Sequence, residues 1–204
     1  MKKLNSLRDL ISHLERVAPE LIDLALAKDN QEFSTLLDIF LERAAAHVEA
    51  NARSFFNLDE VGLSAVVATY FNGMPGIQVI QEGHSNGHVD LTVTVNLVSP
   101  TRRVLAEAKI ESGPAYHEKG LAQLLGRYST GRYPNAWLLV YVKSGAIKTR
   151  LEALRQHLDT TKPLNQTGKC RDHPARWFFM SDHIHASQEQ ITVTHAGFNL
   201  AAGA

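Results

Sequence analysis

Two neighbouring runs of alternating apolar residues constrain the fold of this chain more than any other feature. The first run extends from Gly87 to Leu97 and has valine or leucine at every second position, starting with Val89. Because successive side chains of a strand point to opposite faces, this pattern predicts a strand with one apolar and one polar face. Asp90 is the first residue of the polar face.

The second run, Val104–Ile110, contains the sequence Glu107-Ala108-Lys109. In an extended strand, Glu107 and Lys109 point to the same side, while Ala106, Ala108 and Ile110 face the core. The pattern therefore predicts a carboxylate and an amine side by side. A competing interpretation is an exposed ion pair on the surface of the sheet, which would have no role in chemistry.

A hairpin is expected between the two runs, because the connection 98–103 is short, polar and contains Pro100. Antiparallel pairing would bring Asp90 near Glu107. An upstream helix should add Glu60, which precedes an apolar stripe at helical spacing. The stripe consists of Leu63, Val66, Val67 and Tyr70. Alternatively Glu60, like its neighbour Asp59, is a first-turn acid that complements the helix dipole.

This order of elements resembles the PD-(D/E)XK phosphodiesterase superfamily of restriction-endonuclease-like proteins. The order is helix with an acid, strand, strand with Asp90, strand with Glu107 and Lys109, helix and strand, and it spans residues 57–143. The resemblance implies an α/β fold with a mixed central sheet flanked by helices. It also implies that Glu60, Asp90, Glu107 and Lys109 are the catalytic residues. Val89 stands where the family's name has a proline.

The chemistry of phosphodiester hydrolysis explains why these residue types would gather. The reaction needs positive charge at the attacked phosphate, an activated water and a stabilised leaving oxygen, which a hard divalent cation supplies. Mg²⁺ prefers oxygen ligands, so Asp90, Glu107 and the carbonyl of Ala108 are the predicted ligands, with Mn²⁺ as the alternative ion. Lys109 would orient the attacking water or serve as general base. Glu60 would support a second ion or metal-bound water.

The resemblance implies a Mg²⁺-dependent endonuclease that cleaves DNA in restriction, repair or defence against phage, with RNA as a second substrate class. The alternative function is a catalytically degenerate module that binds nucleic acid or supports assembly. A third interpretation is a zinc-stabilised domain that uses His84, His88, His183 and His185, but Cys170 is the only cysteine and no paired ligand spacing is present. His88, close to Asp90, is also a candidate substrate contact.

The helix after Glu-x-Lys is expected to supply secondary contacts. Some branches of the family carry a glutamine and a tyrosine there, and Gln123–Tyr128 is similar with one extra residue between the two. The apolar stripe of this helix, Leu121, Leu124, Leu125 and Tyr128, leaves Gln123 on the opposite side with Lys119 and Arg127. These three residues either contact phosphate or form a solvated helix face.

Composition favours a modest enzyme of the cytoplasm. The chain has 204 residues, 44% of them apolar, and its 21 basic and 21 acidic residues balance. Acids dominate before Val61, whereas the nuclease-like part is more basic, and a neutral total fits an enzyme that assembles or meets an activating partner. A single cysteine excludes a disulfide scaffold. No apolar run is long enough to span a membrane.

The chain divides into an N-terminal helical hairpin, residues 1–55, and a nuclease-like core with C-terminal strands, residues 56–204. The hairpin is predicted as two amphipathic helices joined near Lys28-Asp29-Asn30, which either cap the core or form a homodimer or partner surface. In the core, a buried strand is expected at 136–143 and a helix from Ile147. A loop should follow at 162–176, then two strands at 176–180 and 190–195, with a histidine-rich segment between them.

Overall fold

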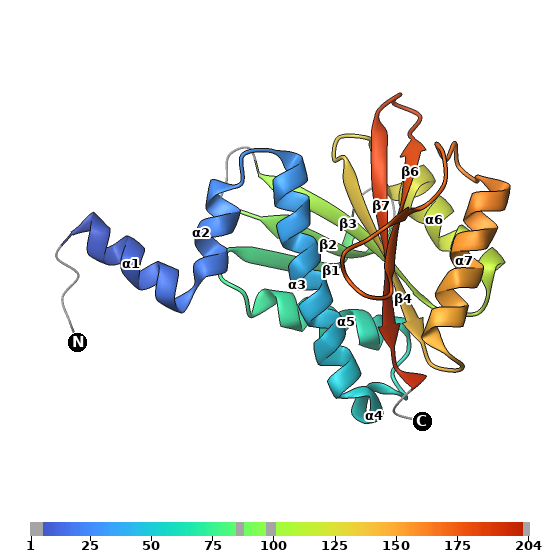
Figure 1. The fold of residues 1–204 in the computed structure, drawn as a ribbon, viewed down its shortest axis with the longest axis horizontal. Coiled ribbons are helices and arrows are strands. Elements are labelled where there is room, and N and C mark those ends of the chain that lie inside the picture. Colours follow the sequence, from blue (N-terminus) through green and yellow to red (C-terminus); the bar gives the residue numbers. More distant parts are fainter. Residues whose placement is uncertain (1–5, 85–87, 97–100, 202–204) are drawn as a thin grey trace.

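The two alternating runs form adjacent antiparallel strands, β2 (His88–Val95) and β3 (Arg102–Ile110), of one seven-stranded sheet (Figure 1). The other strands are β1 (Ile77–His84), β4 (Asn135–Val142), β5 (Arg171–Asp172), β6 (Phe178–Ile184) and β7 (Gln190–Asn199). Their order across the sheet is β1-β2-β3-β4-β7-β6-β5, and β4 is parallel to both of its neighbours. The computed structural model describes residues 6–84, 88–96 and 101–201, and only the backbone at Leu21, 82–84 and His88.

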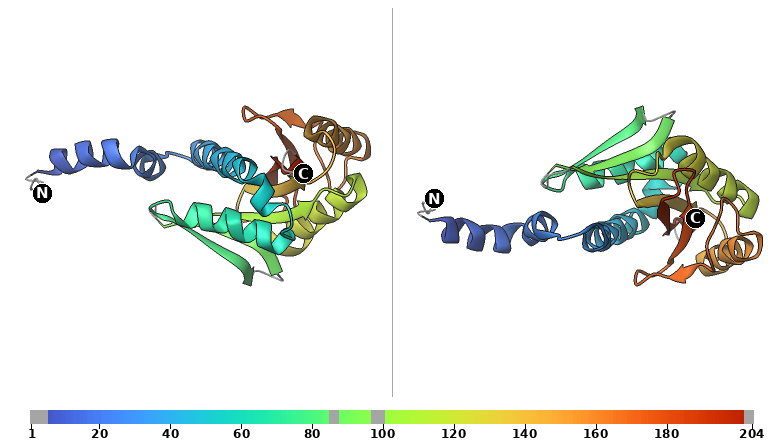
Figure 2. Two further views of the ribbon diagram at one scale, coloured as in Figure 1. Left: turned by 90° about the horizontal axis from the view of Figure 1, so that it is seen from below. Right: turned by 90° about the horizontal axis from the view of Figure 1, so that it is seen from above.

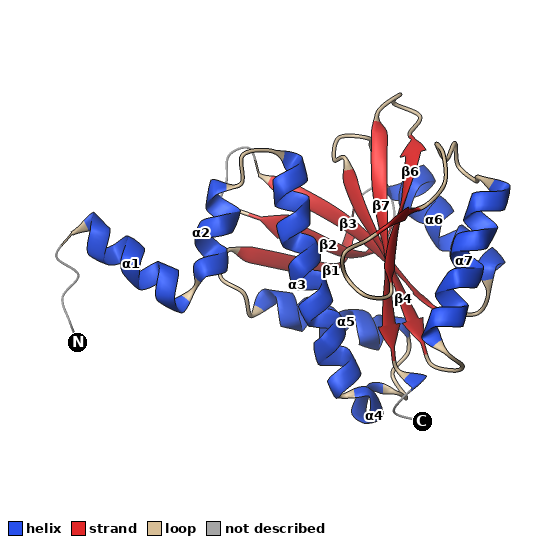
Figure 3. Ribbon diagram, viewed as in Figure 1, coloured by secondary structure: helices blue, strands red, loops and turns tan. Residues whose placement is uncertain are grey.

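Helices cover both faces of the sheet, which confirms the predicted α/β class (Figures 2 and 3). They are α1 (Leu7–Val17), α2 (Pro19–Leu26), α3 (Asn30–Ala50), α4 (Ala52–Phe55), α5 (Glu60–Asn72), α6 (Pro114–Gln123), the π-helical turn η1 (Leu124–Tyr128) and α7 (Ile147–Thr161). The first apolar core lies between the sheet and α3 and α5, and the second lies between the sheet and α6, η1 and α7. None of the helices within the described ranges is long and apolar enough to cross a membrane.

The position of β4 at the centre of the sheet explains why the run that begins at Ala136 is apolar without interruption as far as Val142. Trp137, Leu139 and Tyr141 belong to the first core, whereas Leu138, Val140 and Val142 belong to the second. A strand that is covered on both faces loses the polar half of the alternating pattern. Trp137 also donates its indole N–H to Asp38 Oδ1 of α3, at 2.9 Å, which gives this buried ring a polar partner.

The N-terminal segment is helical, but its first predicted helix is broken in two. Pro19 begins α2, and the preceding Ala18 leaves the helical conformation, because proline lacks an N–H and disfavours helical geometry at the residue before it. Only α3 packs extensively on the core, through residues such as Leu37 and Leu41. The prediction of a simple two-helix hairpin is therefore wrong, since α1 does not fold back along α3 (Figure 1). The division at residue 55 stays a prediction.

The C-terminal strands are longer than predicted. The first one, β6, does not end at Met180 but continues through Asp182 and His183 to Ile184, where it pairs with β7. His183 is consequently a buried strand residue, not a loop histidine. The expected loop at 162–176 is mostly irregular and contains the two-residue strand β5, which pairs with β6.

Candidate active site

Glu107 and Lys109 form a buried ion pair on the face of β3 that is covered by α6. Lys109 Nζ lies 2.6 Å from Glu107 Oε1, and the two residues are 8% and 2% exposed. Ala106 and Ala108 point to the opposite face and are fully buried in the first core, as the alternation predicts. The interpretation of this pair as an exposed surface ion pair is therefore wrong, because both side chains are largely buried.

Asp90 lies where β2 and β3 separate. Their ladder ends at the pair of Leu91 and Ala106, so the next free backbone N–H on this edge of β3 belongs to Ala108. Asp90 Oδ2 accepts that N–H at 2.7 Å. An extended residue directs its N–H and its C=O to the same neighbour, so the Ala108 carbonyl lies at this edge as well. Two of the predicted metal ligands thus meet at the end of the ladder.

Glu60 reaches the same end of β3 from the first turn of α5. Its Oε2 accepts the N–H of Ile110 at 2.6 Å, and the hydroxyl of Tyr116 donates to the same carboxylate at 3.2 Å. The cap of α5 is instead Asp59, whose Oδ1 accepts the N–H of Gly62. The helix-dipole interpretation therefore describes Asp59, whereas Glu60 joins α5 to the sheet.

Tyr116 was not among the residues predicted from the sequence. It lies in the first turn of α6, and its ring is also 5.6 Å from Lys109 Nζ. Its position in the sequence could have indicated it. Tyr116 follows the Glu-x-Lys strand closely, and a helix that packs back on the sheet brings its first turn near the end of that strand. Tyr116 therefore touches both Glu60 and the buried ion pair.

The charges of the site oppose the ionisation of Glu107. Burial and the nearby Asp90 raise the pKa of Glu107 to about 7, although Lys109 acts in the opposite direction. The second carboxylate oxygen, Oε2, is buried and has no hydrogen-bond partner among the residues that the structure describes. Burial alone would lower the pKa of Lys109, but its hydrogen bond to Glu107 and the charges of Glu107, Glu60 and Asp90 prevail, so that pKa is raised and the amine is protonated.

The donor set fits a hard divalent cation that keeps part of its water shell. Within residues 6–84, 88–96 and 101–201, no three histidine, cysteine, aspartate or glutamate side chains are placed to hold a metal by themselves. Asp90 and Glu107 contribute carboxylate oxygens, one of which is buried and unpartnered, and Ala108 contributes a carbonyl. Mg²⁺ typically uses one or two carboxylates together with water and substrate oxygens, so these residues suit it better than they suit zinc.

The helix after Glu-x-Lys departs from the regular geometry assumed in the sequence analysis. Residues Leu124–Tyr128 form a π-helical turn, closed by the N–H of Ser129 and the carbonyl of Leu124, which absorbs the extra residue between Gln123 and Tyr128. The helical wheel used in the sequence analysis assumed 3.6 residues per turn, and this assumption fails at the π-helical turn. Gln123 is half-buried, whereas Lys119 and Arg127 are exposed.

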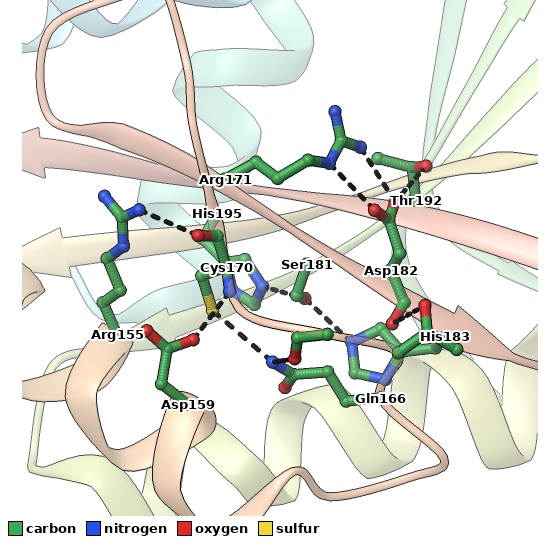
Figure 4. A network of polar contacts seen from close by, with 12 residues as sticks. Arg155, Asp159, Gln166, Cys170, Arg171, Ser181, Asp182, His183, Thr192 and His195 are labelled. Atoms are coloured by element: carbon green, nitrogen blue, oxygen red, sulfur yellow. Dashed lines mark hydrogen bonds and ion pairs between the residues drawn. The ribbon is translucent and has the colours of Figure 1, made fainter.

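Of the four histidines considered for zinc, the structure describes the side chains of His183 and His185, and these two belong to separate hydrogen-bonded groups. The side chains of His84 and His88 lie outside the described part of the structure. His185 is bonded to Ser187, and His183 belongs to a buried chain in which Ser181 Oγ lies 2.8 Å from His183 Nε2 and 2.7 Å from His195 Nε2 (Figure 4). Nearby, the thiol of Cys170 contacts the amide of Gln166, and burial raises the thiol pKa to about 12.

The buried chain has one direction of hydrogen bonding. His183 Nδ1 faces the carbonyl of Leu164, which only accepts, so His183 Nδ1 donates and its Nε2 accepts from Ser181. Ser181 then accepts from His195 Nε2, and His195 Nδ1 accepts from His117 Nε2 at 2.9 Å. Each histidine is thereby held in a single neutral tautomer. The remaining nitrogen, His117 Nδ1, carries a lone pair and is buried with no partner in the described part of the chain.

Comparisons of the chain with protein-family models, with curated proteins and with solved structures found no match.

Proposed function

We propose that this protein is a Mg²⁺-dependent phosphodiesterase that cleaves DNA at the site formed by Glu60, Asp90, Glu107 and Lys109. The observation that supports the proposal most strongly is Glu107. Its carboxylate is buried, one oxygen has no hydrogen-bond partner within residues 6–84, 88–96 and 101–201, and Asp90 lies close enough to disfavour its ionisation. A bound cation would remove this conflict. The unpartnered oxygen would coordinate it, and its positive charge would offset the repulsion between the two carboxylates.

In this proposal, each residue of the site has a separate role in hydrolysis. When bound, Mg²⁺ would supply positive charge to the attacked phosphate and acidify the attacking water. Asp90, Glu107 and the Ala108 carbonyl would hold that ion. Lys109, which is protonated in this setting, orients the water and adds a second positive charge near the phosphate, a role that its raised pKa favours over that of general base. Glu60, which is held by hydrogen bonds from Ile110 and Tyr116, is the third carboxylate of the site.

The choice of DNA as substrate, and a cytoplasmic role in restriction, repair or defence, rest on the resemblance to restriction-endonuclease-like proteins. Exposed Lys119 and Arg127 on α6 and η1 are candidate phosphate contacts next to this site, with half-buried Gln123 between them. His88, at the start of β2, is a further candidate. An activating partner would account for the balanced net charge of the chain.

The direct test is nicking and linearisation of supercoiled plasmid with Mg²⁺, Mn²⁺ or EDTA. We expect metal-dependent cutting by the wild type and a loss of at least about a hundredfold in Lys109→Ala, because a charge near the reacting phosphate is removed. The control is Lys169→Ala, which removes an exposed lysine far along the chain and should cut normally. Cutting that survives in Lys109→Ala would indicate a contaminating nuclease and contradict the assignment.

Metal binding separates an active nuclease from a catalytically degenerate module. Mn²⁺ titration followed by electron paramagnetic resonance should show binding by the wild type and by Lys109→Ala, and much weaker binding by Asp90→Ala and Glu107→Ala. Equal affinity in the wild type and Asp90→Ala would show that the metal binds elsewhere. A wild type that neither binds Mn²⁺ nor cuts DNA or RNA would leave the degenerate module as the function.

A further inference from the structure

A hollow of about 720 Å³ lies between the end of β7 and the start of α7, and its lining includes Lys148, Arg176, Trp177 and Asn199. Strands β3, β4 and β7 run parallel, so their C-terminal ends meet at one edge of the sheet (Figure 1). The candidate active site lies at the same edge, where β3 ends. Since neighbouring strands are about 5 Å apart, two strand spacings, or about 10 Å, separate the end of β7 from the end of β3. A strand of nucleic acid at the active site is long enough to reach the hollow.

The lining of the hollow carries positive but no negative charge among the residues that the structure describes. Lys148 is exposed in the first turn of α7, and Arg176 is exposed just before β6. The ammonium of Lys148 lies 3.8 Å from Glu152, but both side chains are mostly in solvent, so this ion pair is weak. Glu49 acts on Arg176 electrostatically without lining the hollow. The charge of the hollow therefore favours an anionic ligand.

The guanidinium of Arg176 rests over the ring of Trp177. Its Cζ atom lies 4.8 Å from the centre of that ring. Within residues 6–84, 88–96 and 101–201 this guanidinium makes no hydrogen bond and no ion pair, so its N–H groups are available to a ligand. Arginine combines contact with an aromatic face and a planar fork of N–H groups that matches two oxygens of a phosphate. Arg176 is therefore the residue of the hollow best suited to bind phosphate.

The backbone around Trp177 keeps this ring in place. Trp177 has a φ of 64°, in the left-handed region that bulky residues rarely occupy. Its carbonyl accepts the N–H of Gly197 at 3.1 Å, and a Cβ atom at Gly197 would lie only 2.9 Å from the same oxygen. The ring itself packs against the second core. The surface on which Arg176 rests is therefore a fixed part of the fold, so less conformational entropy is lost when a ligand binds.

Further polar groups at the hollow are available to a ligand. Asn199 Oδ1 is buried, and no described residue donates a hydrogen bond to it. At the start of α7, Ala146 offers no side-chain cap to the first N–H groups of the helix. Such N–H groups bind phosphate oxygens, whereas the oxygen of Asn199 needs a donor, such as a sugar hydroxyl or the amino group of a base. A nucleotide unit carries both kinds of group.

We infer that the hollow binds a nucleotide unit, whose phosphate is held by Arg176 and Lys148. Asn199 accepts a hydrogen bond from the sugar or the base of the same unit. The binding of a nucleotide does not depend on the proposed activity. Its assignment to the DNA strand in the active site does rest on the proposed function, and it places this unit a few nucleotides from the bond that is cleaved.

The test is a titration followed by the fluorescence of Trp177 in the presence of EDTA, where no metal-dependent cutting occurs. The chain has two tryptophans, and Trp137 is 1% exposed in the core, so a change on ligand addition reports on the half-buried Trp177. A short thymidine oligonucleotide and thymidine monophosphate should each cause a saturable change. Arg176→Ala should raise the dissociation constant at least about tenfold, because charge-assisted hydrogen bonds to phosphate are lost, and Lys148→Ala should raise it less.

Arg8→Ala and Lys169→Ala are the matched controls, because each removes an exposed cation that does not line the hollow, and both should bind like the wild type. Three outcomes would overturn the inference: no change with either ligand, equal affinity in Arg176→Ala and the wild type, or equal affinity for thymidine without phosphate.

The two ligands also distinguish the source of the nucleotide. Tighter binding of the oligonucleotide would assign the hollow to a DNA strand, whereas equal binding of the monophosphate would assign it to a free nucleotide. Because the titration does not measure cutting, a failed plasmid assay would leave its result valid. Cutting that persists while the titration fails would contradict the nucleotide hollow alone.

Discussion

At the scale of single residues, the surroundings of Glu107 oppose the ionisation of its carboxyl group. Its pKa of about 7 lies above the ordinary value of 4.5, with burial as the largest cause and Asp90 as the next. The folded protein therefore holds this proton more tightly than the unfolded chain does. In the absence of metal, Glu107 lowers the free energy of unfolding as the pH rises from about 4.5 to about 7, and its effect is constant above that range.

Metal affinity should follow the same titration. A carboxylate must lose its proton before it binds a cation, so the affinity for Mn²⁺ should fall by up to about tenfold for each pH unit below about 7. Isothermal titration at several pH values measures this slope, and the proton released on binding can be obtained from buffers of different ionisation enthalpy. An affinity that stays constant across this range would show that Glu107 is not a ligand.

At the scale of elements, α6 holds the buried ion pair in place through a close contact at Gly120. A Cβ atom at this position would lie 2.9 Å from Lys109 Cγ, 3.1 Å from Lys109 Cε and 3.2 Å from Leu138 Cδ1. Glycine therefore lets the helix approach β3 closely enough to cover Lys109. The neighbouring π-helical turn contains a second glycine, Gly126, where a Cβ atom would meet nothing within 4 Å.

These two glycines form a matched pair of test sites. Alanine favours a helix over glycine by about 1 kcal/mol, so Gly126→Ala should leave cleavage unchanged and stability equal or slightly higher. Gly120→Ala should displace Lys109 and reduce the cleavage rate at least roughly tenfold, while the free energy of unfolding changes by only about 1 kcal/mol. Plasmid cleavage and urea unfolding of both variants measure the two effects. Equal activity in the two variants would show that the position of α6 does not matter for the site.

At the scale of the whole molecule, the chain of His117, His195, Ser181 and His183 connects elements that are distant in sequence. It begins on α6, crosses β7 and β6 and ends at the loop carbonyl of Leu164. Burial lowers the pKa of His117 to about 3 and lowers the pKa values of His183 and His195 as well. All three rings are therefore neutral in the folded protein, and a proton added to His183 or His195 would break the order of donors.

This chain should make the protein sensitive to acid. Because the histidines titrate near 6.5 in the unfolded chain and well below that when folded, the free energy of unfolding should fall as the pH drops from about 6.5 toward about 3. Nitrogen-15 spectra of the imidazoles should show a protonated Nδ1 for His183 and a protonated Nε2 for His195 and His117 at neutral pH. The opposite tautomer at His183 would contradict the assigned direction.

Loss of the hydroxyl that joins two of the rings gives a second measurement of the same chain. Ser181→Ala leaves His195 Nε2–H and His183 Nε2 without their shared partner in the buried interior, so the free energy of unfolding should fall by about 1–3 kcal/mol. The control is Ser187→Ala, which removes an exposed hydroxyl bonded to His185 and should change stability by less than about 0.5 kcal/mol.

Local periodicity determined much of this fold. Alternation placed Glu107 and Lys109 on one face of a strand and Ala106 and Ala108 on the other, and the antiparallel return brought Asp90 to the same strand end. These features could be predicted because the direction of each side chain follows from backbone geometry within a few residues. The break at Pro19 has an equally local cause. It was missed because the apolar residues before and after Pro19 follow one continuous helical spacing.

Only the tertiary structure decided the features that depend on how distant segments meet. The burial of Glu107 and Lys109 requires α6 to cover β3, and the contact of Tyr116 with Glu60 joins residues on different helices. The extra residue before Tyr128 was visible in the sequence, but its absorption into a π-helical turn depends on packing against the sheet. The histidine chain joins α6, β6 and β7 in the same way. The sequence by itself determined which residue types line each strand and helix, because that follows from local geometry, whereas their burial, their pKa values and their partners arise only when the elements pack together.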